Sequence, residues 1–476
     1  MGGADALAGG PGGHERLAEL IPVALAGLAA GVAERGTAGP AGGPAAVAAT
    51  LTAVAPLVPA EGVGAERALG ELSRLLAAGS VDPAEPWCAA HLHCPPLAVA
   101  VAADVVAGAL NPSLDSWDQA PAASELEREF VTAMARLCYP GERAPDALVT
   151  TGGTESTLLG LLLARARDPG VRPVCGANAH HSVARTAWLL GLPAPVVVGC
   201  EGERMSVSAL EEALSRLDGL PAVVVATAGT TNTGEIDPLR DIAEICRRHG
   251  ARLHVDAAYG GLALCSPGLR PLLDGLDAAD SVGLDMHKFG WQPISAGLLA
   301  VRAAADLDAL TVRAEYLNAA DDTEAGLPDL LGRSIRTSRR PDAFRMAVTL
   351  RALGVEGMGA LVSRCCRTAA EIAELIEAQP GLRLWGRPTL STVVFRPSIA
   401  DGLAGPAGDA LVSRVRRALL EAGSAIIGRA TLDGRVWLKL TFLHPHATVA
   451  DYRGLLDETV ATATAEASAA EGVAAS

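Results

Sequence analysis

One lysine stands at a position where its residue type is informative. The 476-residue chain has 39 basic side chains, and only Lys288 and Lys439 among them are lysines. Lys288 follows a histidine in the apolar segment SVGLDMHKFGWQPISAG. A lysine amine forms Schiff bases with carbonyl groups, and arginine does not. Retention of lysine here, in a chain that otherwise uses arginine, predicts a Schiff-base nucleophile. A solvent-facing lysine of no consequence is the alternative.

Lys439 fits that alternative better than Lys288 does. In the segment VWLKLTF it alternates with the apolar residues Val436, Leu438, Leu440 and Phe442. Because successive side chains of a strand point to opposite faces, this alternation predicts Lys439 on the more polar face of a strand.

An acidic residue follows a predicted strand 32 positions before Lys288. The segment ARLHVDAAYGG has the pattern of a buried strand that ends at Asp256. Ligands of open α/β sheets bind beyond the carboxyl ends of the strands, so an acid there is placed for a ligand cation such as a pyridinium nitrogen. A carboxylate beside that nitrogen keeps it protonated. A helix-capping Asp is the alternative.

A glycine turn and a histidine pair give two further signals. The segment LVTTGGTESTLLGLLLAR is typical of a strand, a glycine turn and a helix, in which Gly153 and Thr154 offer a seat for a phosphate group. Simple capping by such a turn is the alternative. His180 and His181 precede a predicted helix, where an imidazole could stack on an aromatic cofactor or could be merely exposed.

A metal site is not expected. His91, His93 and Cys94 in the segment HLHC could be pictured as ligands together with His180 and His181. The sequence has no HExxH motif and no second Cys/His cluster at zinc spacing.

A lysine nucleophile, an acid for a ring nitrogen, a phosphate seat and a stacking histidine together predict pyridoxal 5′-phosphate (PLP) as the cofactor.

The composition bounds the partners and the compartment. A formal net charge of −15 disfavours nucleic acids and anionic membranes. The nine cysteines are scattered without a CxxC pair, which is typical of reduced thiols in a cytoplasmic protein. The apolar run LIPVALAGLAAGVA lacks the basic flank of a signal peptide and predicts a surface or dimer-wrapping helix. No uninterrupted run of strongly apolar residues predicts a membrane span.

The elements that position these residues follow an α/β pattern. The segments AVVVATAG, IDPLRDIAEICRRHG and ARLHVDAAYGG predict a strand, a helix and a strand, and such repetition predicts a mainly parallel sheet with helices on both faces. After about Gly354, LSTVVFRP and RVWLKLTFL alternate around the helical segment GDALVSRVRRALLEAG and predict a smaller α+β domain with an antiparallel sheet. We expect an N-terminal helical segment at 1–86, loose at 1–13 and 36–48, a large domain at 87–355 and a small domain at 356–476.

The motifs TGGTES, HVDAAYGG and DMHK, in this order and spacing, resemble the PLP-dependent group II amino-acid decarboxylases. The resemblance covers about residues 87–451 and implies the aspartate-aminotransferase-like fold, fold type I. Further segments are similar to the L-2,4-diaminobutyrate decarboxylase branch; they are AHLHCPP, NPSLDSWDQAPAASELE, EYLN and SIRTSRRPDAFRMAVTLRALG.

The resemblance implies roles for individual residues. Lys288 would carry the Schiff base, Asp256 would pair with the pyridine nitrogen, and His180 would stack over the ring and could move protons. Other residues would contact the cofactor or hold the lysine: Gly153, Thr154, Thr230, Ala258 and His287. His91, His93 and Cys94 would line the substrate entrance, with Leu92 between them. These enzymes are usually homodimers with shared sites, so Ser338 and Arg339 could reach the cofactor of the partner subunit.

Some positions depart from the family pattern. The aromatic branch has a mobile-loop Tyr as proton donor, and this chain has Leu330 at that position, so His180 or a group of the partner subunit could take that role. Pro341, Arg345, His444 and His446 also replace the usual residues of their segments. The leading hypothesis is a decarboxylase that converts a small or diamino L-amino acid into an amine and CO₂. The alternatives are a PLP enzyme that forms an aldehyde by oxidative deamination and a cofactor-binding protein without turnover.

Overall fold

The computed structural model describes residues 5–312, 314, 317, 319–403 and 405–475. The chain folds as two compact units, and each is treated by itself below. One unit combines Met1–Pro95 with Arg367–Ser476, and the other is Pro96–Cys366.

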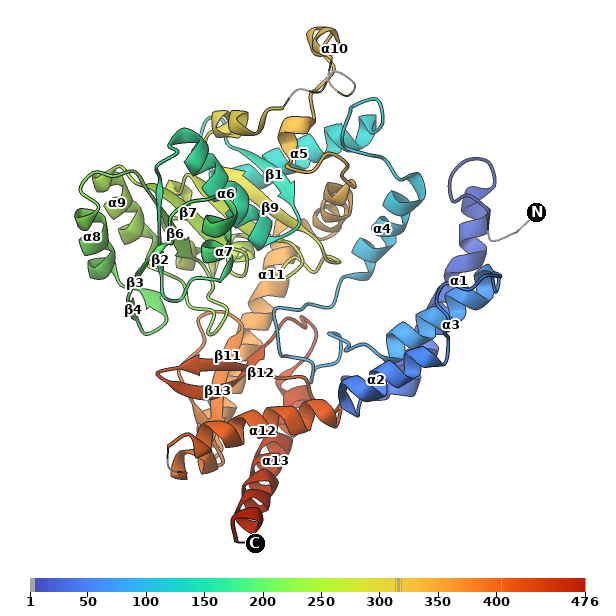
Figure 1. Cartoon of the computed structure of the whole chain (residues 1–476), viewed down its shortest axis with the longest axis vertical. Helices are drawn as coiled ribbons and strands as arrows, with labels where there is room; N and C mark the ends of the chain where they lie inside the picture. Colours follow the sequence, from blue (N-terminus) through green and yellow to red (C-terminus); the bar gives the residue numbers. More distant parts are fainter. Residues whose placement is uncertain (1–4, 313, 315–316, 318, 404, 476) are drawn as a thin grey trace. The chain divides into compact units, whose positions relative to one another are not determined.

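The central unit, Pro96–Cys366, is built around a seven-stranded sheet (Figure 1). All neighbouring strands are parallel except at β9, which is antiparallel to both of its neighbours. This confirms the expected α/β class with a mainly parallel sheet. In spatial order the strands are β1 (Asp146–Thr150), β9 (Gly297–Val301), β8 (Ser281–Asp285), β7 (Arg252–Ala257), β6 (Ala222–Thr227), β2 (Arg172–Gly176) and β3 (Val196–Val198).

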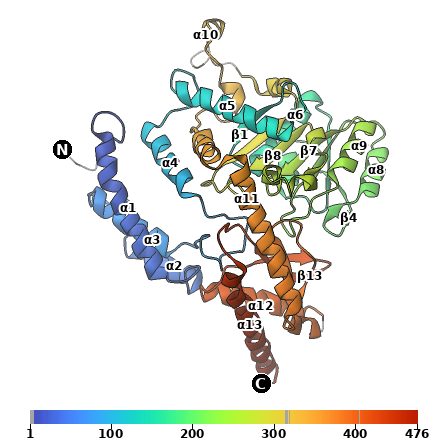
Figure 2. The same ribbon diagram turned by 180° about the vertical axis from the view of Figure 1, so that it is seen from behind.

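Helices cover both faces of this sheet, as the long apolar strands require. Helix α6 (Gly153–Arg167) lies over the face seen in Figure 1, and α5 (Pro121–Cys138) over the face seen in Figure 2. The predicted helix before Asp256 is α9 (Leu239–His249), which starts after Pro238 and ends at the left-handed Gly250. The other helices of this unit are α4 (Ala98–Leu110), α7 (Ser182–Leu189), α8 (Val207–Arg216), α10 (Ala320–Glu324) and the first part of α11 (Asp342–Ala378).

The second unit contains a four-stranded antiparallel sheet in the order β10 (Leu382–Leu384), β11 (Thr392–Pro397), β13 (Arg435–Thr441) and β12 (Gly428–Leu432). Helices α12 (Ala407–Glu421) and α13 (Val449–Ala475) accompany it, which confirms the α+β pattern expected for this part of the chain. Its core is aliphatic and aromatic, and Phe395, Phe442 and Tyr452 are among its buried members.

The N-terminal residues group with this C-terminal part instead of standing apart. Ala89 N–H donates to the Ile426 carbonyl, and Thr441 N–H donates to the Ala89 carbonyl, so a short N-terminal stretch joins the C-terminal strands. The unit boundaries fall after residues 95 and 366. They therefore differ from the three segments with boundaries after residues 86 and 355 that the sequence predicts.

Three helices make up most of the first 80 residues: α1 (Gly13–Arg35), α2 (Gly43–Thr52) and α3 (Ala65–Ala78). The expectation that 36–48 is loose is wrong from residue 43, because the Ala-rich segment with Pro44 in its first turn starts a helix there. Glycines allow α1 to approach α3 closely. A Cβ on Gly27 would lie 2.7 Å from the Gly70 carbonyl, and one on Gly31 would lie 2.2 Å from the Arg74 carbonyl.

Two of the described helices, α1 and α11, are long and apolar enough to cross a membrane by length and composition alone. Core helices of soluble proteins pass the same test, and about a third of the apolar window in α11 is buried.

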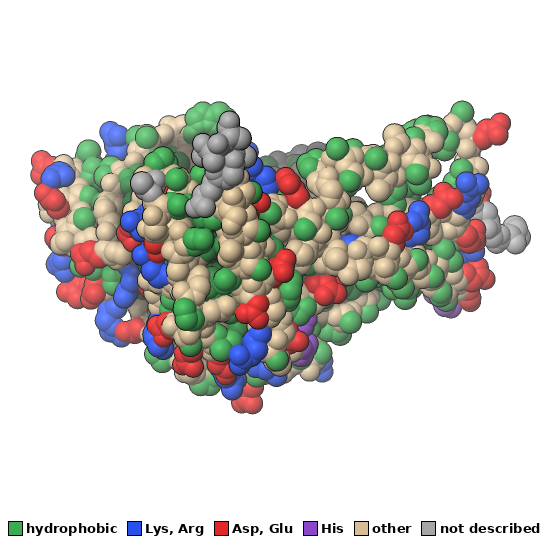
Figure 3. Space-filling view, turned by 90° about the horizontal axis from the view of Figure 1, so that it is seen from below, with side chains coloured by type: hydrophobic (Ala, Val, Ile, Leu, Met, Phe, Trp, Pro, Cys, Tyr) green, Lys and Arg blue, Asp and Glu red, His purple; other side chains and the backbone are tan. Residues whose placement is uncertain are grey.

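On the face shown in Figure 3, acidic and basic side chains are interspersed with apolar ones. All nine cysteines are free thiols.

The expectation for Lys439 is wrong. Strand β13 lies between β11 and β12, so both of its edges are paired. Lys439 is 7% exposed, and it lies directly opposite Gly428, where a Cβ would be 3.2 Å from the lysine Cε. Burial lowers the pKa of Lys439 to about 8. The side chain of Lys439 is therefore buried, and the alternation of polar and apolar residues alone does not reveal this burial.

Candidate active site

The predicted site residues of the central unit gather at one edge of its sheet. Strand β1 runs in the same direction as β8, because both are antiparallel to β9. The carboxyl ends of β1, β2, β6, β7 and β8 therefore meet at the same edge. The residues at or just after these ends are Gly153 and Thr154, His180, Thr230, Asp256 and Ala258, and His287 and Lys288. This is the edge at which ligands of open α/β sheets bind.

The turn between β1 and α6 approaches the lysine segment so closely that only glycine fits. Gly152 has a φ of 148°, and a Cβ there would lie 2.8 Å from His287 Cε1 and 3.2 Å from Asp285 Oδ1. A Cβ on Gly153 would lie 2.7 Å from the Cβ of Ala258. The structure thus places Gly153 beside Ala258 and Gly152 beside His287, and the contacts of these residues with a cofactor stay a prediction.

The first turn of α6 keeps its backbone donors for a ligand. The first N–H groups of a helix have no partner within the helix, and they attract anions. The Glu155 carboxylate does not occupy them, because it turns back to accept hydrogen bonds from Thr151 N–H at 2.6 Å and from the Thr151 hydroxyl at 2.7 Å. Thr154 is exposed in this turn. A turn that only caps the helix would explain the hydrogen bonds between Glu155 and Thr151. It would give no role to the first backbone N–H groups of α6.

Lys288 is held by a carboxylate that the sequence analysis did not single out. Its Nζ lies 2.9 Å from Asp285 Oδ2, and His287 Nε2 lies 3.5 Å from the same oxygen. The side chain of Asp285 is 3% exposed and that of Lys288 is 17% exposed. The alternative of a solvent-facing Lys288 is therefore wrong. The signal for Asp285 was present in the sequence, since it is the last residue of the strand SVGLD and lies three residues before the lysine.

Asp256 is the other buried carboxyl of the site. It is 7% exposed near the end of β7, and its Oδ1 accepts the N–H of Ala258 at 3.1 Å. Burial raises the pKa of Asp256, while the charge of Lys288 opposes that rise. The helix-capping alternative is wrong, because this bond closes a local turn and the next helical turn starts after Gly260 without a side-chain cap. The bond leaves the other carboxyl oxygen, Oδ2, unengaged. A protonated ring nitrogen is a partner that would satisfy this oxygen.

His180 is a neutral imidazole at physiological pH. Burial, together with the positive charges of His181 and Lys288, lowers the pKa of His180 to about 4. The Ser182 backbone N–H donates to His180 Nδ1 at 3.3 Å, so the ring proton belongs on Nε2. The two histidine rings lie 4.0 Å apart, and His181 is the exposed member of the pair. A neutral ring can stack on an aromatic cofactor and still donate a hydrogen bond from Nε2.

Thr230 has a structural task in its own turn. Its hydroxyl lies 2.8 Å from the Thr233 hydroxyl and accepts the N–H of Glu235 at 3.1 Å. Thr230 is buried, and the strand before it is tied to the next one because Ala228 N–H donates to the Asp256 carbonyl. Thr230 therefore shapes the loop beside Asp256, and any contact with the cofactor stays a prediction.

Ser338 and Arg339, the two residues expected near the partner subunit, differ in their burial. Ser338 is exposed, and its hydroxyl lies 3.4 Å from Asp115. Arg339 is 3% exposed, and its guanidinium pairs with Glu127 at 2.9 Å, so this side chain is already engaged within its own chain.

Leu330 is buried in a small apolar cluster. Of the motif EYLN, residues 315, 316 and 318 lie outside the described residues.

The three predicted substrate residues belong to the other unit. Cys94 is buried, whereas His91 is exposed at its surface. Burial of part of the His91 ring and the nearby charges of Lys439 and Arg416 lower the pKa of His91. The role of His91, His93 and Cys94 toward the substrate stays a prediction.

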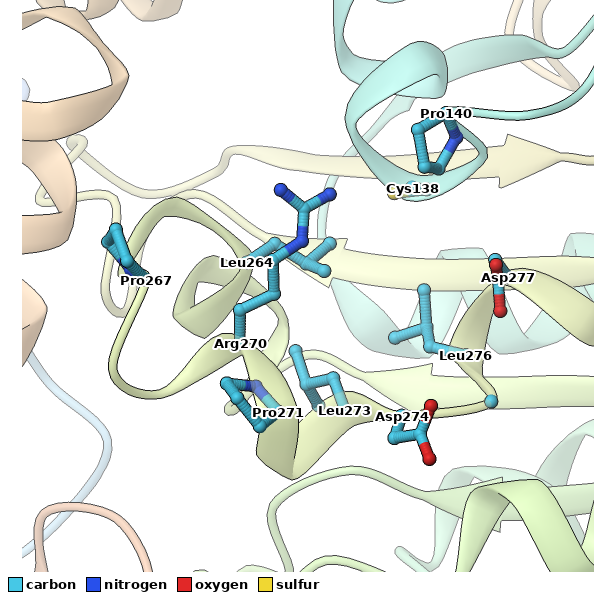
Figure 4. Close-up of a pocket in the computed structure, with 11 residues that line it drawn as sticks. Cys138, Pro140, Leu264, Pro267, Arg270, Pro271, Leu273, Asp274, Leu276 and Asp277 are labelled. Atoms are coloured by element: carbon cyan, nitrogen blue, oxygen red, sulfur yellow. The ribbon is translucent and has the colours of Figure 1, made fainter.

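A separate cavity of the central unit contains none of these residues. It has a volume of about 390 Å³ and lies between the end of α5 and the short turns after β7 (Figure 4). Leu264, Leu273 and Leu276 form apolar parts of its wall, and it has no lysine, histidine or glycine-rich helix start. It does not provide the chemistry that the sequence predicts. Among the described residues, no group of three or more His, Cys, Asp or Glu side chains could hold a metal ion.

The residues around Lys288 fit PLP on three counts. The glycine turn leaves room that a Cβ would fill, the start of α6 offers backbone donors to a phosphate, and Lys288 provides the amine for an aldehyde. Asp285 Oδ1 is buried beside that turn without a hydrogen-bond partner among the residues described. The fold and the site together define a PLP-dependent enzyme of fold type I.

Comparison with known proteins gives the family. The model of the pyridoxal-dependent decarboxylase conserved domain matches residues 54–398. The chain belongs to this family and is a PLP-dependent amino-acid decarboxylase.

Named relatives agree with this assignment. The chain is 40% identical to an L-2,4-diaminobutyrate decarboxylase of Rhizobium meliloti (strain 1021), over 84% of this chain and 82% of that protein. It is 35% identical to the enzyme of the same name from Acinetobacter baumannii, over 85% of each chain. Among solved structures, the glutamate decarboxylase domain of diaminobutyrate-pyruvate transaminase and L-2,4-diaminobutyrate decarboxylase from Vibrio parahaemolyticus has a TM-score of 0.84 at 29% identity. That match covers 96% of this chain and 98% of that one.

Proposed function

We propose that the chain decarboxylates L-2,4-diaminobutyrate, or a diamino acid of similar length, to the corresponding diamine and CO₂. With L-2,4-diaminobutyrate the products are propane-1,3-diamine and CO₂. The observation that carries the proposal is the similarity to two L-2,4-diaminobutyrate decarboxylases over more than four fifths of the chain.

The charge of the chain supports a cationic substrate. L-2,4-diaminobutyrate has two ammonium groups and one carboxylate, so its net charge at neutral pH is positive. A chain with a formal net charge of −15 attracts such a molecule and repels the anions glutamate and aspartate. This long-range effect favours a diamino acid over an acidic one.

Two residues of the central unit hold and tune the cofactor in this proposal. PLP, when bound, supplies an electron sink for the pair of electrons left when CO₂ departs. Lys288 supplies the amine that holds the cofactor and that the substrate amine displaces. Asp256 keeps the ring nitrogen protonated, because its buried carboxyl and that nitrogen share a proton.

His180 takes the role of the group that guides a solvent proton to Cα. The loop position that is Tyr in the aromatic branch is Leu330 here, and Leu330 is buried among apolar side chains. The Nε2–H of His180 can donate a hydrogen bond to a water molecule, because Nδ1 accepts from the Ser182 backbone. That water gives a proton to Cα and the hydroxide left behind takes up a proton from solvent, so the product is the amine.

Assembly and location are part of the proposal. The chain forms a homodimer in which the exposed Ser338 faces the site of the partner subunit, and His91, His93 and Cys94 contact the substrate. The protein acts in the cytoplasm, which agrees with nine cysteines that are all free thiols. It does so without a membrane anchor, and the Gly27 and Gly31 face of α1 serves packing against α3.

The test is an amino-acid panel with the purified, PLP-loaded chain. L-2,4-diaminobutyrate, ornithine, lysine, glutamate, aspartate and tyrosine are supplied separately, and CO₂, amine, aldehyde and peroxide are measured. We expect one amine per CO₂ from L-2,4-diaminobutyrate and at least about tenfold lower kcat/KM for the acidic substrates. Aldehyde and peroxide without amine would establish the oxidative alternative, and turnover of none of the six would remove the proposed activity.

A further inference from the structure

The cavity shown in Figure 4 lies away from the proposed cofactor site. Cys138 and Pro140, which precede β1, line it. Leu276 and Asp277, which precede β8, line it as well. The cavity is therefore near the edge of the sheet at which β1 and β8 begin, whereas Lys288 follows the other end of β8. Its residues have no part in the decarboxylation proposed above.

The wall of the cavity is mostly apolar and rigid. Three leucines line it, and they are between 1% and 6% exposed: Leu264, Leu273 and Leu276. Three prolines line it as well: Pro140, Pro267 and Pro271. Proline rings fix the backbone φ angle, so these parts of the wall hold their shape without a ligand. The volume of about 390 Å³ is in the range of small-molecule sites, which are largely preformed.

Arg270 brings a positive charge to one side of this apolar wall. In Figure 4 its side chain extends past Leu264 toward the end of α5. Burial raises the pKa of the Cys138 and Cys265 thiols, and the charge of Arg270 opposes both rises, so its guanidinium is close to them. Among the described residues, no carboxylate pairs with this guanidinium. Arg270 is thus available to the carboxylate of a ligand.

Asp274 and Asp277 lie on the other side of the cavity. Figure 4 shows leucine side chains between Arg270 and these two aspartates. Both carboxylate oxygens of Asp274 accept hydrogen bonds from Arg240, which does not line the cavity. Asp277 is exposed, and no basic side chain in the described part of the chain pairs with it. Asp277 is therefore the acid that is available to a cationic group.

The turn that carries the two aspartates is fixed in place by Gly275. This residue has a φ of 92°, and a Cβ there would lie 2.5 Å from the Arg240 Cα. The turn is therefore packed closely against the start of α9, where only glycine fits. An acid held on such a turn keeps its position relative to the leucines.

We propose that this cavity binds a small ω-amino acid, a molecule whose carboxylate and ammonium groups are joined by an unbranched apolar chain. The carboxylate pairs with Arg270, the methylene groups cover the leucines, and the ammonium group pairs with Asp277. Arginine suits the carboxylate end, because its guanidinium offers two parallel donors. Binding makes and breaks no covalent bond. The inference is independent of the proposed substrate, since no residue of the site around Lys288 lines this cavity.

The experiment measures binding to the full holoenzyme by calorimetry. The cofactor is first fixed to the protein with borohydride, so that ligand amines cannot react with it. The ligands are 5-aminopentanoate, 6-aminohexanoate and 8-aminooctanoate, and each is compared with the carboxylic acid and the alkylamine of the same chain length. The variants are Arg270→Gln and Asp277→Asn, which replace exposed charges by neutral amides. Arg165→Gln, at an exposed arginine of α6 that does not line the cavity, is the matched control.

We expect at least one ω-amino acid to bind wild type with a dissociation constant on the order of 1 mM or below. It should bind at least about fivefold more tightly than its matched acid and its matched amine, because each of these lacks one charged hydrogen bond. Arg270→Gln should lower its affinity to that of the matched alkylamine. Asp277→Asn should lower it to that of the matched carboxylic acid. Arg165→Gln should bind like wild type.

Each other outcome overturns the inference. One is that none of the three ω-amino acids binds wild type at about 10 mM. Another is that the matched acid or the matched amine binds as tightly within about twofold, because one of the two charged side chains would then have no part. Binding that neither cavity variant changes would place the ligand elsewhere. If a variant does not fold, the comparison of the three ligand types on wild type decides. A failure of the proposed substrate leaves all these results unaffected, because the measurement needs no turnover.

Discussion

Asn178 and Asp237 are joined by a hydrogen bond of 2.8 Å from the Asn178 amide to Asp237 Oδ1, although 59 positions separate them in the chain. Asp237 also accepts the backbone N–H of Met205 at 2.7 Å and that of Thr227 at 2.7 Å. One buried carboxylate thus holds the turn that leads to His180, a neighbouring loop and the end of β6.

Replacement of Asp237 should therefore affect both stability and the site. In Asp237→Asn an amide –NH₂ would face a backbone N–H, and one buried donor would lose its acceptor. We expect the free energy of unfolding to fall by about 1–3 kcal/mol. Displacement of the His180 turn should also lower kcat/KM by about tenfold or more. Urea unfolding and steady-state kinetics measure the two effects. The exposed Asp218→Asn, at a position with φ of 48° that asparagine tolerates, is the matched control.

The two lysines allow a direct test of the cofactor attachment. Lys288→Arg keeps a positive charge beside Asp285 but forms no Schiff base, so the yellow absorbance near about 420 nm should be absent after incubation with PLP. We expect decarboxylation to fall by at least about 1,000-fold. Lys439→Arg should retain the absorbance. If Lys288→Arg still turned yellow, another amine would have to be the attachment site, and mass spectrometry after borohydride reduction would locate it.

Acid should destabilise the central unit through His254. This ring is 1% exposed on β7, its Nδ1 lies 2.8 Å from the Ser281 hydroxyl, and burial lowers the pKa of His254 to about 4. The unfolded chain has an ordinary histidine pKa of about 6.5, so it binds the proton first as the pH falls. The native state therefore loses about 3 kcal/mol between about pH 6.5 and about pH 4 through this group.

The measurement for His254 is the urea midpoint as a function of pH. We expect the midpoint of His254→Asn to depend less on pH than that of wild type in this window, although its absolute stability is lower. His181→Asn, at an exposed ring, should keep the wild-type slope. Parallel pH profiles for wild type and His254→Asn would contradict the assignment.

The close approach of α1 and α3 should tolerate no side chain at Gly31. A Cβ there would lie 2.2 Å from the Arg74 carbonyl and 2.7 Å from the Ala77 Cβ. We expect Gly31→Val to separate the two helices and to lower the free energy of unfolding by about 1–3 kcal/mol or more. The separation should also expose α1 to limited proteolysis. Gly62→Ala, where no atom lies within 4 Å of the added carbon, should digest at the wild-type rate.

The parts of the site that sequence patterns predict are those that short segments determine. A strand followed by a glycine turn and a helix specifies Gly153 and Thr154 locally, and a buried strand ending in an acid specifies Asp256. The position of Lys288 after a strand follows the same logic. Parallel strands then bring these ends to one edge, which gathers the residues that the local patterns single out, while their roles toward the cofactor stay a prediction.

Contacts between distant segments were not predictable in this way. Arg339 looks like a free cation in the sequence, yet it pairs with Glu127, 212 positions earlier. The burial of Lys439 depends on what covers its face of the sheet, which the alternation of a single strand does not show. The pairing of Asp285 with Lys288 is different, because only three positions separate the two residues and the signal was therefore present in the sequence.

The division of the chain into units determines the order in which parts can fold during synthesis. The first 95 residues belong with Arg367–Ser476, and about 270 residues separate the two segments. At about 5–20 residues per second, the ribosome needs roughly 15–55 s to make that interval. The central unit is complete before the second half of the other unit exists. Ala89, which pairs with Ile426 and Thr441 in the folded chain, must wait during that time without these partners. The nascent chain therefore passes through a period in which holding chaperones would determine its yield.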